Sequence, residues 1–67
     1  MAKIQLNGKK ITLKSNFSVF DLLKKYKLTN KKIAVEHNGC ILQKNEYKKK
    51  NLKNNDKLEI VHFIGGG

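Results

Sequence analysis

The final segment of the sequence constrains the fold most, because a strand-forming run leads directly into three glycines. β-Branched and aromatic residues predominate between Leu58 and Ile64, and apolar side chains fall on both faces of the predicted strand. Such a strand is typical of the interior of a sheet. Gly65–Gly67 lack a Cβ, so we expect a thin flexible tail that reaches about 10 Å further and ends in a free carboxylate. A frayed end without function is the alternative.

Length and composition favour one small domain, with residues 1–64 folded and residues 65–67 as the tail. A chain of 67 residues buries only about 60% of the surface that its unfolded form exposes. Cys40 is the single cysteine, which excludes a disulfide framework or a cysteine metal cluster. The sequence shows no apolar run of roughly 18 residues and no signal peptide, so we expect a cytoplasmic protein without a membrane segment. A deep catalytic pocket is not expected at this size, which favours a carrier or binding protein over an enzyme.

The net charge of +10 comes from lysine alone, because all 15 basic residues are lysines. Base recognition and bidentate phosphate binding favour arginine, so this composition predicts diffuse attraction to acidic partners. A small nucleic-acid-binding domain is the alternative from another class, but it requires aromatic side chains exposed on a sheet. We expect a monomer that binds neither nucleic acid nor a cofactor. His37 and His62 lack ligand spacing, so they are predicted to be structural and no metal site is expected.

Two Asn-Gly pairs between apolar runs predict two β-hairpins. Around Asn7-Gly8, the two-residue turn places all apolar side chains of residues 2–13 on one face. The second hairpin spans residues 33–43 around Asn38-Gly39 and has a less regular pattern. A two-residue turn would place Ile33, Val35, Cys40 and Leu42 on one face, which leaves Ile41 beside Ala34 and Glu36. In this position Cys40 is interpreted as a small strand residue rather than a reactive thiol.

A helix is predicted between the hairpins, with Ser18 as N-cap and Asp21 at N3 in a short capping box. Phe17 and Leu22 occupy the positions of a hydrophobic staple. The predicted buried stripe consists of Val19, Leu22, Leu23 and Tyr26. After the second hairpin, residues 44–55 read as an irregular connection with room for one helical turn. The predicted architecture is α+β, with one main helix on one face of a mixed sheet of about five strands.

This order of elements resembles the β-grasp fold of ubiquitin-like proteins, and it resembles most closely the ThiS family of sulfur carriers in thiamine biosynthesis. The resemblance covers nearly the whole chain. It is carried by residues 4–8, 19–23, 33–36, Asn38-Gly39 and the end Leu-Glu-Ile-Val-His-Phe-Ile-Gly-Gly-Gly. The lysine-rich segment 48–53 departs from the family, and Asn55 stands where the family more often has glycine.

The resemblance implies a role for Gly67 as a modified residue. In the family, an adenylating (E1-like) enzyme uses ATP to convert the terminal glycine into an acyl-adenylate. A persulfide sulfur, supplied by a donor such as a cysteine desulfurase, then gives a thiocarboxylate that thiazole synthase consumes. Gly65 and Gly66 would be the thread that enters a narrow cleft. The protein would be a co-substrate without catalytic residues.

We expect Phe63 and Ile64, with Leu42, to form an exposed apolar patch for partners on the sheet face away from the helix. The alternative is that all three are core residues. Two related functions share the tail chemistry: the sulfur carrier of molybdopterin synthesis, and a ubiquitin-like protein modifier that ends in an isopeptide bond.

Overall fold

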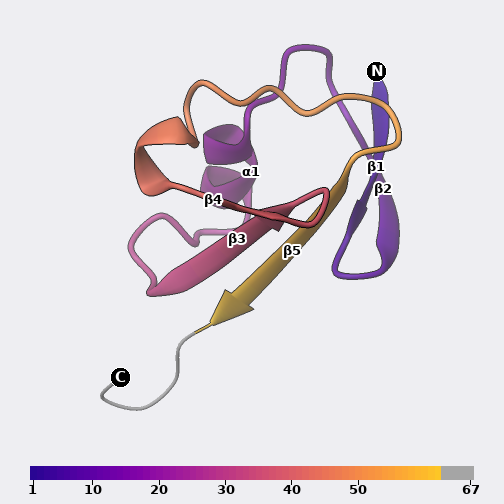
Figure 1. Ribbon diagram of the computed structural model, residues 1–67. Helices are drawn as coiled ribbons and strands as arrows, with labels where there is room; N and C mark the ends of the chain where they lie inside the picture. The colour runs from indigo at the N-terminus through magenta and orange to yellow at the C-terminus, as the bar shows by residue number, and fades with distance from the viewer. Residues whose placement is uncertain (63–67) are drawn as a thin grey trace.

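Two β-hairpins, one α-helix and a closing strand make up the structure, a computed structural model that describes residues 1–62 (Figure 1). The elements in chain order are β1 (Ala2–Leu6), β2 (Lys9–Leu13), α1 (Val19–Lys25), β3 (Ile33–His37), β4 (Cys40–Leu42), the 3₁₀ turn η1 (Lys44–Glu46) and β5 (Lys57–His62). The strands form one sheet in the order β2-β1-β5-β3-β4. Helix α1 lies across one face of this sheet, so the predicted α+β architecture is confirmed.

Strand β5 occupies the centre of the sheet and joins the two hairpins. It runs parallel to β1, with Leu6 beside Leu58, and antiparallel to β3, with Ile33 beside His62. Backbone bonds continue this pairing, since Asn7 N donates to Leu58 O at 2.9 Å. The interior position predicted for the last strand is confirmed for Lys57–His62. Residues 63 and 64 of the predicted strand lie outside the described residues.

Both Asn-Gly turns have the predicted geometry. Asn7 and Gly8 have φ values of 49° and 84°, and Asn38 and Gly39 have 50° and 87°. Left-handed backbone at both central residues is the requirement of a type I′ turn, whose twist matches that of the strands. The turns fix the predicted registers, with Ala2 opposite Leu13 in the first hairpin.

The N-terminus of α1 is capped as predicted. Ser18 Oγ accepts a hydrogen bond from Asp21 N, and Asp21 Oδ2 accepts one from Ser18 N, both at 3.0 Å. Hydrogen bonding to the carboxylate from the Ser18 backbone, and then from the Ser18 side chain, lowers the pKa of Asp21 because it favours the charged form. The prediction that Tyr26 is buried is wrong. The helix ends at Lys25, and Tyr26 is its C-cap with 43% of its surface exposed.

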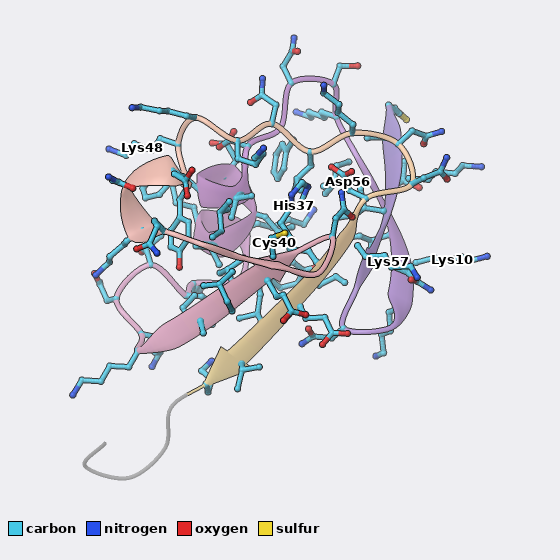
Figure 2. The ribbon with its side chains drawn as sticks, in the orientation of Figure 1. Lys10, His37, Cys40, Lys48, Asp56 and Lys57 are labelled. Atoms are coloured by element: carbon cyan, nitrogen blue, oxygen red, sulfur yellow. The ribbon has the colours of Figure 1, made fainter. Side chains whose placement is uncertain are left out.

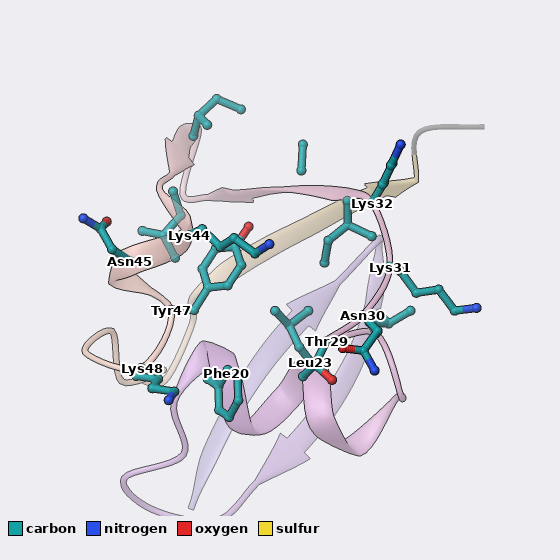
Figure 3. A pocket seen from close by; sticks show the side chains of 15 residues that line it. Phe20, Leu23, Thr29, Asn30, Lys31, Lys32, Lys44, Asn45, Tyr47 and Lys48 are labelled. Atoms are coloured by element: carbon teal, nitrogen blue, oxygen red, sulfur yellow. The ribbon is translucent and has the colours of Figure 1, made fainter. Parts of the chain in front are cut away.

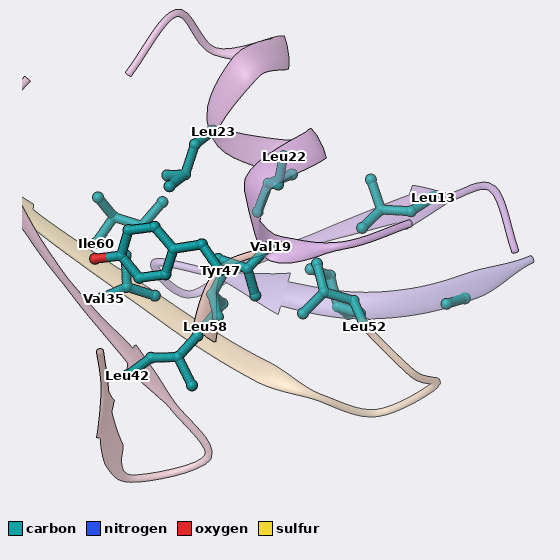
Figure 4. Packing of buried hydrophobic residues seen from close by; sticks show 12 residues of the cluster. Leu13, Val19, Leu22, Leu23, Val35, Leu42, Tyr47, Leu52, Leu58 and Ile60 are labelled. Atoms are coloured by element: carbon teal, nitrogen blue, oxygen red, sulfur yellow. The ribbon is translucent and has the colours of Figure 1, made fainter. Parts of the chain in front are cut away.

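The core lies between α1 and the inner face of the sheet (Figure 4). Val19, Leu22 and Leu23 project from the helix and are almost completely buried. The connection between η1 and β5 adds two buried side chains, Tyr47 and Leu52, to this core. Its backbone is bonded to the start of the helix, because Val19 N donates to Lys50 O and Leu52 N to Phe17 O. No helix within residues 1–62 is long and apolar enough to cross a membrane.

Candidate functional site

The end of β5 is the point from which the predicted functional residues continue. His62, the last described residue, pairs with Ile33 at one end of the sheet (Figure 1). Five residues predicted to act in partner binding or modification lie outside the described residues: Phe63, Ile64, Gly65, Gly66 and Gly67. The structure therefore positions the strand that carries them and the surface around that strand.

An apolar patch lies on the outer sheet face, away from α1, near the end of β5. It consists of Ala34, Ile41 and Val61, one from each of three adjacent strands. Val61 is 56% exposed and sits directly opposite the partly buried Ala34, and Ile41 is 62% exposed in the edge strand β4. Large apolar side chains exposed close together typically mark a contact surface. We refer to these three residues as the outer patch.

The expectation that Leu42 belongs to an exposed patch is wrong. Leu42 is only 8% exposed, lies opposite Val35 and packs in the core beneath the helix. Side chains alternate across a strand, so a buried Leu42 requires its neighbour Ile41 to emerge on the outer face. The alternation in the second hairpin therefore contained the signal that Ile41 was the exposed residue.

Two acidic residues are paired in the register of the sheet beside the outer patch. Glu36 of β3 is directly opposite Glu59 of β5, and Glu36 is also opposite Ile41 of β4. Like charges in directly opposed positions destabilise a sheet. The pair is notable in a chain with a net charge of +10 and only five acidic residues. A cationic group from a partner would relieve this repulsion, which makes Glu36 and Glu59 candidate contact residues that the sequence analysis missed.

A polar cluster fastens the β3–β4 turn to the start of β5 (Figure 2). His37 Nε2 lies 3.0 Å from Asp56 Oδ2, and Asn38 Nδ2 donates to Asp56 Oδ1 at 3.1 Å. Lys53 N also donates to Asp56, and Lys57 N donates to Asn38 Oδ1. Partial burial by itself raises the pKa of Asp56, but the hydrogen bonds from His37, Lys53 N and Asn38 outweigh it and lower that pKa. His37 thus has the structural role predicted for it.

The remaining histidine and cysteine side chains are His62 and Cys40. No group of three or more His, Cys, Asp or Glu side chains there could hold a metal ion. His62 is exposed, and Cys40 is a free, exposed thiol at the start of β4.

The strand order β2-β1-β5-β3-β4 with one covering helix places the protein among the ubiquitin-like β-grasp proteins. Comparison with known proteins gives the particular family. The ThiS family model matches residues 3–67, and the chain belongs to the ThiS family.

Two relatives and a solved structure illustrate the similarity. The sulfur carrier protein ThiS of Bacillus subtilis (strain 168) is 45% identical over 65 residues, which cover 96% of this chain and 98% of that protein. A thiazole synthase of Paramagnetospirillum magneticum (strain ATCC 700264 / AMB-1) is 38% identical over 97% of this chain, but only 20% of that longer protein is covered. The crystal structure of the thiamine biosynthesis protein ThiS from Geobacter metallireducens superimposes with a TM-score of 0.82, at 29% identity over 97% of this chain and 99% of that one.

Proposed function

We propose that the protein is a sulfur carrier of thiamine biosynthesis that transports sulfur as a thiocarboxylate on Gly67. The observation that carries the proposal is the family match through residue 67, which includes the glycines of the tail. The similarity to a named sulfur carrier over 98% of its length supports the same function. The protein would act as a co-substrate of other enzymes in the cytoplasm and would contribute no catalytic residue.

Activation is needed because a carboxylate is a poor electrophile. An adenylating enzyme would join the Gly67 carboxylate to AMP from ATP and release pyrophosphate. The terminal sulfur of a persulfide on a donor such as a cysteine desulfurase would then attack the acyl carbon and displace AMP. Cleavage of the remaining sulfur–sulfur bond by a thiol would leave the thiocarboxylate and a disulfide. Gly65 and Gly66 would let this end enter a narrow cleft because they carry no side chains.

The outer patch is the surface that we propose for these partners. Ala34, Ile41 and Val61 would supply apolar contact next to the tail, and Phe63 and Ile64 would extend it. The opposed Glu36 and Glu59 would select a cationic side chain on the partner. Thiazole synthase is proposed as the acceptor, because thiazole synthases with a ThiS-like region are among the relatives.

The relatives favour thiazole formation over molybdopterin synthesis or protein modification. A nucleic-acid-binding role receives no support from the described part of the outer face, where the side chains aligned with the outer patch are aliphatic, polar or charged. The positions paired there hold lysines, Gln5, Thr12 and the Glu36–Glu59 pair, and none of these side chains is an aromatic platform for bases.

The test is intact-protein mass spectrometry after incubation with ATP, the adenylating enzyme and a sulfur donor. We expect a mass gain equal to the exchange of one oxygen for sulfur, which fragmentation assigns to Gly67. The reaction without ATP is the negative control, and a Cys40→Ser variant should react like the wild type. A mass gain that maps to Cys40, or an isopeptide-linked product, would contradict the proposal.

A further inference from the structure

A groove of about 930 Å³ lies on the helix side of the molecule, separate from the path of β5 (Figure 3). It is bounded by the face of α1 that carries Phe20 and Leu23, the loop that follows the helix, and the segment from β4 to Lys48. Apolar side chains form its floor: Phe20, Leu23, Leu28, Ile33, Leu42 and Tyr47. Nothing in the proposed chemistry of the tail uses this groove.

Backbone hydrogen bonds fix both walls of the groove. On one wall, Phe20 N donates to Tyr47 O at 3.0 Å, which ties the helix to the segment after η1. On the other, Leu28 N donates to Leu23 O at 2.7 Å as the chain turns back after the helix. The groove is therefore formed before any ligand arrives, which lowers the ordering cost of binding.

The rim of the groove is cationic. Lys31 and Lys32 lie on one side, and Lys44 and Lys48 lie on the other (Figure 3). None of the described residues that line the groove is acidic. The acidic residues nearest in sequence are Asp21 and Glu46, whose carboxylates accept hydrogen bonds from Ser18 N and Gln43 N. Four lysines around an apolar floor are complementary to an anionic ligand with an apolar centre.

Two aromatic residues connect the rim to the floor. The Lys48 ammonium lies 4.9 Å from the centre of the Phe20 ring, so this lysine is held over the groove floor by a cation–π contact. Tyr47 is buried, and burial raises the pKa of its hydroxyl, which as a neutral phenol can donate a hydrogen bond.

We propose that this groove binds a peptide segment of a partner protein, in which aliphatic side chains enter the floor and flanking carboxylates pair with the lysines. An extended segment suits the groove because the groove is open to solvent and borders the edge strand β4, which can pair with an added strand. Ala34 and Ile41 line the groove as well as the outer patch. A protein seated on the patch can therefore place such a segment in the groove without losing its first contact.

The test is an NMR titration of the full-length ¹⁵N-labelled protein with a synthetic peptide whose Leu-Val-Leu centre is flanked by glutamates. We expect saturable shifts of the amides of Thr29, Lys32 and Asn45. The double variant Lys44→Glu/Lys48→Glu should weaken binding by about tenfold or more, because it reverses half of the rim charge. The matched control, Lys9→Glu/Lys10→Glu in β2, has the same net charge and should bind within about twofold of the wild type.

A second peptide separates groove binding from general charge attraction. Replacing the Leu-Val-Leu centre by Ser-Gly-Ser keeps every carboxylate and should abolish saturable binding. Equal binding of the two peptides, or equal weakening by both double variants, would overturn the proposal. Shifts confined to the outer face would also overturn it, as would a short oligonucleotide or ADP that produces the groove shifts at lower concentration than the peptide.

Discussion

The side chain of Asn7 holds both polar backbone groups of Ile60. Asn7 Oδ1 accepts a hydrogen bond from Ile60 N at 2.8 Å, and Asn7 Nδ2 donates to Ile60 O at 3.3 Å. The amide thus continues the pairing of β1 with β5 beyond the last paired residue, Leu6. The same residue supplies the left-handed backbone of the first turn. One asparagine therefore shapes a hairpin and secures the central strand two residues before His62.

Asn7→Gly separates these two roles, because glycine adopts the turn conformation but has no side-chain amide. We expect the free energy of unfolding to fall by about 1–2 kcal/mol from the loss of the two hydrogen bonds. Urea unfolding measures this loss, and hydrogen exchange should show faster exchange at Ile60 N than in the wild type. The amide of Ile4 in β1 is the internal control. Unchanged protection of Ile60 N would show that the contact does not secure the strand.

The Asp56 cluster predicts acid sensitivity. The pKa of Asp56 is below its ordinary value of 3.8 in the folded state, so its contribution to stability is full above that value and is lost as pH falls through and below it. Asp56→Asn should cost about 1 kcal/mol at neutral pH, a modest value because the site is partly solvated. The difference between variant and wild type should shrink on acidification. Urea unfolding across the acidic range measures this difference in the free energy of unfolding. Asp21 also has a lowered pKa, but it is present in both proteins and does not change the difference. A constant difference at all pH values would contradict this account.

The outer patch is tested by placing a charge where an apolar contact is proposed. Ile41→Asp and Val61→Asp change exposed side chains, so the fold should remain intact by circular dichroism. We expect KM for adenylation to rise about tenfold or more, because a carboxylate must lose water in an apolar interface. Thr12→Asp, on the exposed edge strand β2, is the matched control and should leave KM unchanged. Equal effects of all three variants would indicate a general response to charge.

Glu36 and Glu59 predict a conflict between stability and recognition. Glu59→Gln removes a like-charge pair and should stabilise the fold by about 0.2–1 kcal/mol. The same change should slow association with the adenylating enzyme, since a carboxylate that meets a cationic partner is lost. Stopped-flow association rates at two salt concentrations measure the second effect. A variant that is more stable and associates as fast as the wild type would remove Glu59 from the proposed contact surface.

Proposed chemistry at Gly67 predicts strict dependence on tail length. Deleting Gly67 retracts the carboxylate by about 3.5 Å, and a misplacement of about 1 Å can cost on the order of a hundredfold in rate. Adding one alanine after Gly67 should be similarly harmful because its methyl group enters a cleft shaped for glycine. Both variants should unfold at the same urea concentration as the wild type. Mass spectrometry of the adenylation reaction provides the measurement, and wild-type rates for both would exclude Gly67 as the modified residue.

Local sequence rules predicted most of the fold. The Asn-Gly turns determined both hairpin registers, and Ser18 with Asp21 marked the start of the helix. The spacing of Tyr26 from the other apolar residues fits a helix, but the helix ends one residue earlier. Spacing alone does not show where a helix ends, so the burial of Tyr26 was wrongly predicted. Leu42 was placed on the wrong face for a similar reason: its apolar character suits a patch or a core equally well.

Long-range features were beyond these rules. The opposition of Glu36 to Glu59 depends on how β3 aligns with β5, and no turn connects these strands to set their register. The bond between Asn7 and Ile60 requires the parallel pairing of β1 with β5. The lysine-rimmed groove likewise combines side chains from the helix end, β4 and η1. The sequence showed the lysines, but their arrangement around one apolar floor follows from tertiary packing.

Because β5 is the central strand, the outer patch forms only after β5 has joined the sheet. The two hairpins contact each other through β5, and isolated hairpins are marginal in water. A nascent or truncated chain that lacks Lys57–His62 therefore has no complete outer patch, because Val61 of β5 is one of its three residues. An enzyme that docks on this patch would engage finished molecules and ignore incomplete ones. ATP would then be used only on chains that have already folded.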